Sequence, residues 1–579
     1  MTSQATPYRG CDAIADVLTG LGVRTVFAVA GASHTFLLTA LKKRNVSIIS
    51  SRHETGAIAS ADGYARISGG LGIALIITEQ GLPNAIGGLA LAYQACSPVL
   101  VLLARSSNNW IEAESEYDTD KQSLVAPISK WARTPLEANR LAEYVWVGAK
   151  AAQSGRKGPA VLNIPAHFLG ETVERAPATF RSPPTHSLPT APAAEIEQAA
   201  EYIATAEKPL VIAGAGARWG DAGPALRRLS SDFGIPVVGN SQGRGLVPED
   251  WETGFSWPFA QIAAREADCV VWAGARFKQR LGFGLPPRFA ANAKFIQIDL
   301  HAEELHRNRP VDLALHADTG KTLTAIADAL DQRSGQLARK SDWLKTALEP
   351  RIRRVTDVAS RQAHPVHPLR LPRALMDAAP KDMIYVGDGA DIQTWMYGYV
   401  RISEAPGFLD HYPLGSMGVG TPLAVGAAAA ARDMAEPGEA PRRVVLMTGD
   451  GSFGFYPAEL HAAEEAKLPI TVVIANDGAW GSEYHEQKGA IGETVNTMMR
   501  FHDYEKIGEA FGCAGRRVDR ESGLPDALRA AFESDRPTVI NVITDREAGS
   551  EMLSDDLLRM LIFTDLQGGQ TFLDTKDGD

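Results

Sequence analysis

The sequence predicts an α/β protein with three doubly wound parallel-sheet domains and a C-terminal helical tail. Three observations support this prediction. The chain has 579 residues, whereas a single hydrophobic core stops growing near about 250–300 residues. Short apolar runs typical of buried strands alternate with segments of helix length, which indicates parallel sheets covered on both faces. This alternation occurs in three stretches, which we expect to be domains at 1–175, 190–340 and 365–546.

The first stretch opens with an amphipathic pattern, which predicts a helix over residues 9–24. A second helix, rich in Ala and Gly, is expected over 57–67. Apolar runs that end in turn residues predict strands at 24–31, 46–50, 72–78, 97–104 and 159–165. The last of these strands places the end of the first domain shortly after residue 165.

Several prolines among Ser, Thr and Ala indicate a linker over residues 173–193. A second α/β unit follows, with strands expected at 210–213, 236–238, 269–272 and 295–299. A polar helical stretch at 336–362 joins it to the third domain, which begins near Pro368. The final segment, 547–579, has apolar residues at helical spacing, so we expect a helical tail that either packs on the protein or acts as a lid.

The third domain contains a strand–helix–strand unit over residues 444–480 that carries two acidic turns. One strand ends in a Gly-Asp-Gly turn at Asp450, a helix follows over 456–467, and the next strand ends in an Asn-Asp-Gly turn at Asp477. Because ligands bind at the carboxyl ends of parallel strands, both acids are expected at one site. Two carboxylates beside glycines suit Mg²⁺ that holds a diphosphate, although ordinary Asx turns have the same composition.

The spacing of these two turns resembles the signature of the thiamine-diphosphate-dependent enzymes. The resemblance implies that Asp450, Asp477 and the backbone carbonyl of Ala479 bind Mg²⁺. Asp477 stands where many members of the family have Asn, which adds negative charge but keeps an oxygen ligand. The three domains would then be a pyrimidine-binding domain, a central domain that resembles nucleotide-binding domains, and a diphosphate-binding domain.

A second motif lies in the first domain, where Arg-His-Glu-Thr-Gly contains Glu54 and is followed by Ala-Asp-Gly-Tyr-Ala-Arg over 61–66. An acid in the first turn of a helix is also stabilised by the helix dipole alone. The motif nevertheless closely matches the first domain of the same family. The resemblance implies that Glu54 hydrogen-bonds the aminopyrimidine ring of the cofactor and favours the tautomer that removes the proton from the thiazolium carbon.

Further turns complete the site that the resemblance implies. In the segment 414–418, the Gly415 carbonyl would accept a hydrogen bond from the cofactor amine, and Met417 would separate the two cofactor rings. The upstream segment 386–391, Val-Gly-Asp-Gly-Ala-Asp, resembles the first diphosphate-contacting turn of this domain. The implied cofactor-binding residues are Gly389, Ala390, Gly415, Met417, Gly449, Gly451, Ser452 and Asn84.

Three segments, 126–131, 407–411 and 479–481, look closest to the benzaldehyde lyase and 2-hydroxyacyl-CoA lyase branches of the family. The segment 307–312 resembles members that handle acyl-CoA. The resemblance implies a lyase or carboligase that acts on a 2-hydroxyacyl-CoA or a 2-hydroxyketone through an enamine or carbanion intermediate. A decarboxylating synthase of the acetolactate type and a non-catalytic homologue are the alternatives.

Two more acids are candidates for catalysis. Glu116 stands where many relatives have Gln, close to where the substrate would lie. Glu493 follows the metal turn, and the preceding glycines are expected to let a short helix start there and face the cofactor. Glu493 is therefore a candidate proton shuttle.

The central domain carries weak signals for a nucleotide. Gly214-Ala-Gly216 follows a strand, and Gly274 begins a similar turn. In acetohydroxyacid synthases the matching surfaces hold FAD. Aromatic residues over 255–260 replace the glycine-bearing loop found there, so FAD is less expected than ADP, and the absence of any nucleotide is a third reading.

Composition limits the partners that we expect. The net charge of −11 and the lack of basic runs argue against nucleic acid. No apolar run reaches the length of about 18 residues needed to span a membrane. Four widely separated cysteines predict reduced core residues of a cytoplasmic protein. The family resemblance implies a homodimer or homotetramer with active sites between subunits.

Overall fold

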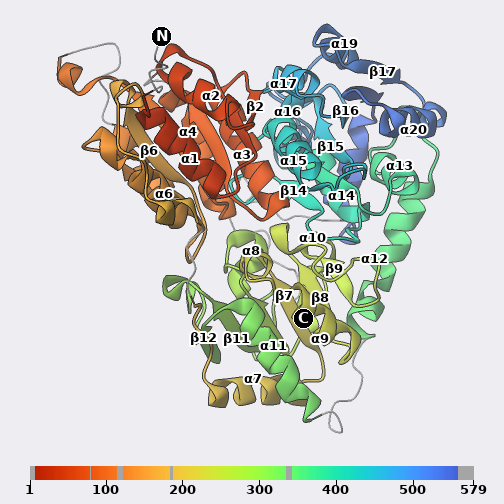
Figure 1. Ribbon diagram of the computed structural model, residues 1–579. Coiled ribbons are helices and arrows are strands. Elements are labelled where there is room, and N and C mark those ends of the chain that lie inside the picture. Colours follow the sequence, from red (N-terminus) through yellow and green to blue (C-terminus); the bar gives the residue numbers. More distant parts are fainter. Residues whose placement is uncertain (1–6, 78–79, 114–120, 183–186, 334–341, 559–579) are drawn as a thin grey trace.

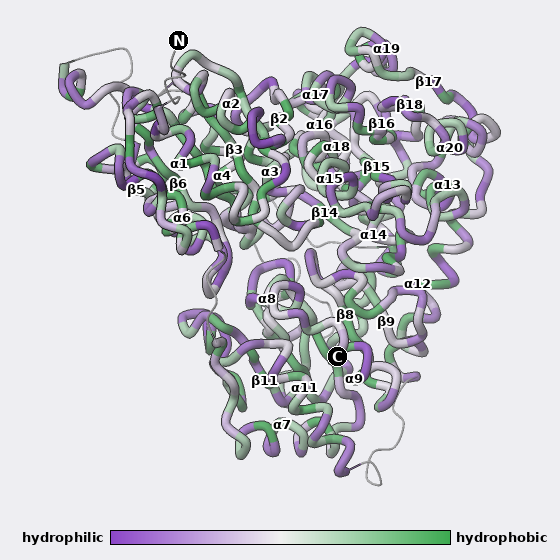
Figure 2. Tube along the Cα trace, in the orientation of Figure 1, coloured by the Kyte–Doolittle hydropathy of each residue, from purple (hydrophilic) through white to green (hydrophobic). Residues whose placement is uncertain are grey.

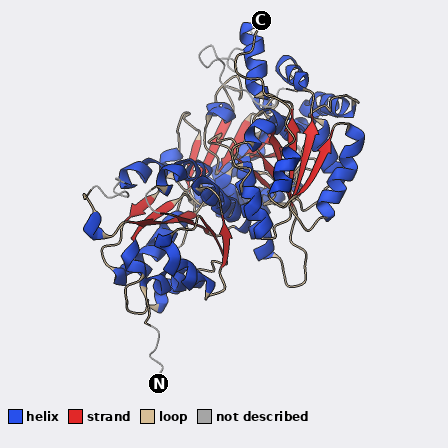
Figure 3. Ribbon diagram, turned by 90° about the horizontal axis from the view of Figure 1, so that it is seen from above, coloured by secondary structure: helices blue, strands red, loops and turns tan. Residues whose placement is uncertain are grey.

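The computed structural model describes residues 7–77, 80–113, 121–182, 187–333 and 342–558. The strands form three six-stranded sheets, and every strand pair within them is parallel. Figure 1 shows three lobes, with the N-terminal sheet at upper left, the C-terminal sheet at upper right and the central sheet below. In Figure 3 helices flank the strands. The predicted α/β class with three parallel sheets is confirmed.

The N-terminal sheet contains β1 (Thr25–Ala28), β2 (Ser47–Ser50), β3 (Gly72–Ile76), β4 (Val99–Arg105), β5 (Trp131–Arg133) and β6 (Ala160–Pro165). Their order is β2-β1-β3-β4-β6-β5. The helices of this part are α1 (Gly10–Gly20), α2 (Thr35–Lys42), α3 (Glu54–Ser68), α4 (Gly81–Ala95), α5 (Lys121–Val125) and α6 (Leu141–Gln153). Strands β3 and β6 are buried along their whole length, as their continuous apolar sequences predict.

The central sheet contains β7 (Pro209–Ala213), β8 (Val237–Gly239), β9 (Gly254–Ser256), β10 (Cys269–Ala273), β11 (Lys294–Asp299) and β12 (Leu313–His316). Its order, β12-β11-β10-β7-β8-β9, reverses between β7 and β10. Its helices are α7 (Ala193–Thr205), α8 (Ala215–Trp219), α9 (Gly223–Ser231), α10 (Trp257–Ala260) and α11 (Thr319–Asp331), and α12 (Trp343–Ser360) leads to the next sheet. Open sheets of this kind bind ligands at the point of reversal.

The C-terminal sheet contains β13 (Ile384–Gly387), β14 (Phe408–Asp410), β15 (Val444–Gly449), β16 (Ile470–Asn476), β17 (Ala514–Val518) and β18 (Thr538–Ile543). Its order, β14-β13-β15-β16-β18-β17, reverses between β13 and β15. The helices are α13 (Arg370–Ala378), α14 (Asp391–Tyr399), α15 (Gly420–Met434), α16 (Asp450–Phe453), α17 (Glu459–Glu465), α18 (Gly481–Ile491), α19 (Tyr504–Ala510), α20 (Leu524–Glu533) and α21 (Gly549–Ser554). The reversal lies beside the turn that contains Asp450.

The N-terminal and C-terminal parts share one hydrophobic core through a crossing of α3 and α15. Glycines allow the two helices to approach closely. If residue 63 carried a Cβ atom, that atom would lie 2.4 Å from the carbonyl oxygen of Leu423. A Cβ atom at residue 426 would lie 1.9 Å from the carbonyl oxygen of Ser60. The Ser60 hydroxyl donates to the carbonyl of Pro422 at 2.9 Å. Figure 2 shows hydrophobic segments gathered along the inner strands and helices. The two helices therefore lock the two parts together without large side chains.

Several elements differ from the expected bounds. The helix expected over 57–67 begins earlier, at Glu54, because the His53 side chain caps it by accepting from the Thr55 amide at 3.1 Å. The helix expected over 456–467 is shorter, and the polar stretch of 336–362 contains α12 in its described part. None of the helices formed by the described residues combines the length and apolar character needed to cross a lipid bilayer.

Candidate functional site

A cleft lies at the carboxyl ends of β13 and β15, where the order of the C-terminal sheet reverses. Its lining includes the residues expected there from the turns of this domain, namely Gly389, Ala390, Met417, Gly449, Asp450, Gly451, Ser452, Asp477 and Ala479. These residues come from four separate turns of the chain. The fold therefore brings the predicted metal and diphosphate turns to one space.

The two acidic turns are held in place by hydrogen bonds to backbone amides. Asp450 is 2% exposed, and its carboxylate accepts from Gly451 N at 2.9 Å and from Gly478 N at 3.0 Å. Asp477 accepts from Ala479 N at 3.0 Å. The bond from Gly478 to Asp450 joins the two turns directly. Both carboxylates thus face each other across the ends of β15 and β16.

The charge of this pair fits a divalent cation. Burial, and then the neighbouring Asp477, raises the pKa of Asp450, and burial also raises the pKa of Asp477. Two carboxylates this close retain a proton unless a cation replaces it. Hard oxygen donors on rigid turns are the ligands that Mg²⁺ prefers. The described residues contain no group of three or more His, Cys, Asp or Glu side chains arranged for a metal, so backbone or ligand oxygens would have to complete the coordination.

A third carboxylate, Asp391, lines the same cleft. It is the first residue of α14, and its Oδ1 is buried without a hydrogen-bond partner among the described residues. Burial, followed by the charge of Asp477, raises its pKa to about 7. Asp391 is the last residue of the segment 386–391 that resembles the diphosphate-contacting turn, but it is not among the individual residues predicted to bind the cofactor.

Asp388 connects two turns that contact the cleft. Its buried carboxylate accepts from Gly389 N at 2.7 Å, from Gly418 N at 3.1 Å and from Gly420 N at 2.9 Å. The His411 Nδ1 lies 3.1 Å from the same carboxylate. Asp388 therefore fixes the turn of Gly389 relative to the turn that carries Met417. Its position before a glycine was visible in the sequence, but its partners Gly418 and Gly420 lie 30 and 32 residues away.

Arg546 supports the turn that contains Asp477. Its Nε donates to the Asp477 carbonyl at 2.9 Å, and its Nη2 donates to the Gly478 carbonyl at 3.0 Å. The guanidinium also lies over the Phe501 ring. No sequence signal marked this arginine, because it is 69 residues from Asp477 and belongs to the boundary with the tail.

Glu54 lies apart from this cleft, at the start of α3 in the N-terminal part. It is 5% exposed, and Asn84 Nδ2 donates to its Oε2 at 3.2 Å. A Cβ on Gly81 would lie 3.0 Å from Oε1, so glycine keeps that side of the carboxylate open. The structure thus pairs Glu54 with Asn84, and neither is among the described residues that line the cleft.

The remaining predicted residues have different outcomes. Gly415 adopts φ +84°, which favours glycine, and its amide donates to the His411 carbonyl at 3.0 Å. Glu493 is exposed and lies beyond the end of α18, which Gly492 terminates in the left-handed conformation. The prediction of a helix that starts at Glu493 is therefore wrong. Glu116 lies outside the described residues.

The tail is described only up to residue 558. Its first part forms α21, and Met552 and Leu558 are buried. Asp555 pairs with Arg354 of α12 at 2.6 Å. This part of the tail packs on its own chain, whereas the apolar residues beyond 558 lie outside the described residues.

A cavity of about 880 Å³ lies where the central sheet reverses. Gly214 and Gly216 after β7 and Gly274 after β10 line it. The N-terminal part contributes residues 93–96 and 155–157, and the C-terminal part contributes Tyr412 and Pro413. Its lining contains the cations Arg156, Lys157, Arg244, Arg276, Lys278, Arg280 and Arg307 and the acids Asp299, Glu304 and Asp410. Arg156 and Arg307 pair with Glu304, and Arg244 pairs with Glu249. The remaining excess of positive charge favours an anionic ligand.

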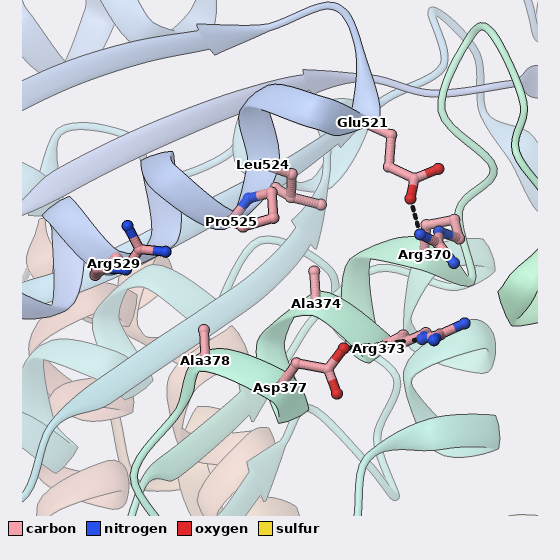
Figure 4. A pocket seen from close by; sticks show the side chains of 9 residues that line it. All are labelled: Arg370, Arg373, Ala374, Asp377, Ala378, Glu521, Leu524, Pro525 and Arg529. Carbon is pink, nitrogen blue, oxygen red and sulfur yellow. Dashed lines mark ion pairs between the residues drawn. The ribbon is translucent and has the colours of Figure 1, made fainter.

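Figure 4 shows a separate groove of about 350 Å³ between α13 and α20. Arg370 pairs with Glu521, and Arg373 pairs with Asp377 at 3.8 Å. Arg529 pairs with Asp526 at 3.0 Å. Every arginine among the described residues that line this groove has a carboxylate partner, so no excess of positive charge is left and we assign no ligand to it.

Comparison of the sequence with protein families gives matches to three successive segments of the chain. Three family models match: "Thiamine pyrophosphate enzyme, N-terminal TPP binding domain" over residues 8–124, the central domain of the same enzymes over 196–326, and their "C-terminal TPP binding domain" over 388–542. The two cofactor-binding models cover Glu54 and Asp450 respectively.

Curated relatives match nearly the whole chain. The acetolactate synthase large subunit IlvG of Mycobacterium tuberculosis is 30% identical over 538 residues, which cover 92% of this chain and 95% of the relative. The 2-hydroxyacyl-CoA lyase 1 of Homo sapiens is 26% identical over 571 residues, which cover 93% of this chain and 95% of the relative. The acetolactate synthase isozyme 2 large subunit of Escherichia coli is 28% identical over 547 residues, covering 93% and 95%.

Proposed function

Because the chain belongs to the thiamine-diphosphate-dependent enzymes, we propose that it cleaves or forms a carbon–carbon bond next to a carbonyl group. The proposed substrate is a 2-hydroxyacyl-CoA, cleaved to formyl-CoA and an aldehyde or ketone, or a 2-hydroxyketone. The observation that carries the proposal is the cleft at the end of β13 and β15, where both acidic turns and Met417 line one space.

In this proposal the C-terminal sheet holds the cofactor. Asp450 and Asp477 would bind Mg²⁺ with the Ala479 carbonyl, and the turns of Gly389 and Gly449 would bind the diphosphate. Bound thiamine diphosphate supplies a thiazolium that accepts the electron pair of the broken bond. The chain's own contribution is to fix the metal, separate the rings with Met417 and exclude water from the cleft.

Glu54 is the proposed catalytic acid of the N-terminal sheet. Its carboxyl group is buried and oriented by Asn84. It would therefore direct its proton to one atom of the cofactor, a ring nitrogen of the aminopyrimidine. Within one chain Glu54 does not line the cleft of Asp450. We therefore propose that the cleft of one copy meets Glu54 of a second copy, which makes a homodimer the smallest active unit.

The second candidate is an acetolactate synthase-type enzyme that decarboxylates a 2-keto acid. Relatives named as acetolactate synthases match at 28% and 30% identity, against 26% for a named 2-hydroxyacyl-CoA lyase. The lyase remains our first choice because Arg307 and Asn308, from the segment that resembles acyl-CoA-handling enzymes, line the cationic cavity.

We also propose that the central cavity binds an adenine nucleotide, with ADP preferred over FAD. Its cationic lining suits a diphosphate, and Trp257 and Pro258 form part of its wall where a glycine-bearing loop would be needed for a flavin. The nucleotide portion of an acyl-CoA would meet the same chemistry. Purified protein should bind ADP in isothermal titration and show no bound flavin absorbance.

The substrate proposal is tested by incubating protein loaded with Mg²⁺ and thiamine diphosphate separately with 2-hydroxyisobutyryl-CoA, benzoin and pyruvate. We expect acetone and formyl-CoA from the first, or benzaldehyde from the second. Acetolactate and carbon dioxide from pyruvate alone would establish the second candidate instead. The variant Glu54→Gln serves as the control, because loss of acid–base help lowers turnover by about 10²–10⁴-fold.

A further inference from the structure

A buried glutamate of the C-terminal part contacts the start of the helix that carries Glu54. Glu459, the first residue of α17, is 1% exposed. Its Oε1 accepts from the backbone amides of Arg52 at 3.0 Å and His53 at 3.1 Å. These two residues directly precede α3. A carboxylate from another part of the molecule therefore binds the N–H groups at this helix start.

The surrounding residues are shaped to admit this carboxylate. A Cβ on Gly56 would lie 2.1 Å from Glu459 Oε1, so only glycine permits the approach. The Tyr456 ring packs edge-on against the His53 ring, with centroids 5.2 Å apart. The start of α3 is thus fixed on one side by its own cap and on the other by residues 456 and 459.

The buried position of Glu459 leaves one of its two oxygen atoms without a hydrogen bond to any residue that the structure describes and is therefore energetically unfavourable. The second oxygen of Glu459, Oε2, is buried and has no hydrogen-bond partner among the described residues. Burial raises the pKa of this side chain to about 7. An unsatisfied buried oxygen lowers the stability of the fold. The two hydrogen bonds that Oε1 accepts from Arg52 and His53 are the favourable part of the contact.

We propose that Glu459 is a positioning residue for Glu54. By binding the amides of Arg52 and His53, it fixes the first turn of α3, and with it the Glu54 carboxyl, relative to the C-terminal sheet. This inference rests on the proposed catalytic role of Glu54. Displacing a catalytic group by about 1 Å can lower the rate by about 100-fold.

The test compares three variants of Glu459 in the full-length protein. Glu459→Gln keeps an oxygen that can accept both N–H groups but removes the charge. Glu459→Asp keeps the charge but withdraws the oxygens by one methylene, and Glu459→Ala removes the acceptor. The matched control is Glu465→Gln, which lies on the same helix and pairs with the Arg52 side chain at 2.8 Å in an exposed ion pair.

The first readout needs no cofactor. Amide hydrogen exchange of the segment 50–58, followed by mass spectrometry, reports directly on the Arg52 and His53 amides. We expect faster exchange in Glu459→Ala and Glu459→Asp, and wild-type exchange in Glu459→Gln and the control. Unchanged exchange in Glu459→Ala would overturn the inference, because the amides would then not need this acceptor. Better protection in Glu459→Asp than in Glu459→Gln would also overturn it, because the charge rather than the position of the acceptor would then matter.

The second readout is proton exchange at the C2 carbon of bound thiamine diphosphate, measured with saturating cofactor. We expect Glu459→Ala to slow it about 10–100-fold, and Glu459→Gln to stay within about threefold of wild type. In a Glu54→Gln background, Glu459→Ala should have no further effect, because the two residues act as one unit. Additive losses would show a general structural role and refute the positioning role.

The two proposals fail in distinguishable ways. If Glu54→Gln exchanges the C2 proton at the wild-type rate, the catalytic role of Glu54 is wrong. If Glu54→Gln loses exchange while Glu459→Ala retains it, only the positioning role is wrong. Should Glu459→Ala fail to fold, the comparison of Glu459→Gln with Glu459→Asp decides the question by itself.

Discussion

The hollows of the central and C-terminal sheets lie at the same topological position but carry an excess of opposite charge. Both are six-stranded and parallel, and each has a hollow where its strand order reverses. In the lining of the central cavity arginines and lysines outnumber the acids, whereas Asp391, Asp450 and Asp477 line the C-terminal cleft. The fold therefore sets the position of each hollow, and the side chains that surround it set its charge.

The turns also differ in how they are built. In the central sheet, glycines pack on glycines: a Cβ on Gly216 would lie 2.7 Å from the Gly274 Cα. In the C-terminal sheet, carboxylates bind the turn amides, as Asp388 and Asp450 do. A glycine turn leaves its amides available to an anion. A carboxylate-filled turn instead requires a cation before a diphosphate can approach.

The largest effect is expected from Asp450→Ala, which removes half of the acidic pair. We expect retention of thiamine diphosphate to fall by at least about 100-fold and to lose its dependence on Mg²⁺. Binding of ADP to the central cavity should be unchanged. Calorimetric titration of both ligands, with and without EDTA, measures this, and undiminished cofactor binding by the variant would remove the metal assignment.

The next effect concerns the carboxylate that joins two turns. Asp388→Ala leaves the amides of Gly389, Gly418 and Gly420 without this acceptor. We expect the affinity for thiamine diphosphate to fall about 10–100-fold at constant Mg²⁺ affinity. Equal losses of both affinities would contradict the distinction between metal ligands and turn support.

The two sites should respond to pH in opposite directions. Burial lowers the pKa of Lys157 and Lys278 to about 8, so both lose their charge as the pH rises from 7 to 9 and ADP affinity should fall about tenfold. Burial raises the pKa values of Asp450 and Asp477, so protons compete with Mg²⁺ as the pH falls from 8 to 6. Parallel pH profiles for the two ligands would contradict the comparison.

The smallest effect is expected from a single cavity lysine. Lys278 donates to Gln94 Oε1 at 2.8 Å and faces the cavity with several other cations. Lys278→Ala should therefore weaken ADP binding only about three- to tenfold, because the other cations remain. Loss of thiamine diphosphate binding in the same variant would show that the two sites are not independent.

The sequence predicted the acidic site better than the cationic one. Asp450 and Asp477 each follow a long apolar strand, so strand ends and turn chemistry placed them together without knowledge of the fold. Asp388, Arg546 and Glu459 were not predicted, because their partners lie roughly 30, 69 and 407 residues away. Only tertiary packing brings such groups together, and no local pattern records it.

The cavity of the central part shows the same limit. Gly214 and Gly274 were visible as turns, but the cavity also takes residues 93–96 and 155–157 from the N-terminal part. The helix expected at Glu493 failed because Gly492, rather than starting a helix, ends α18. Glycine permits both roles, and the choice depends on the packing that precedes it.

The contact between Glu459 and the start of α3 also has a consequence for the order of synthesis. Glu459 follows Arg52 by 407 residues, which at about 5–20 residues per second means about 20–80 s on the ribosome. For most of this interval α3, which is buried on nearly every side in the finished protein, has neither Glu459 nor α15 to pack against. We expect the nascent chain to occupy chaperones for that time, and slower translation to lengthen its exposure.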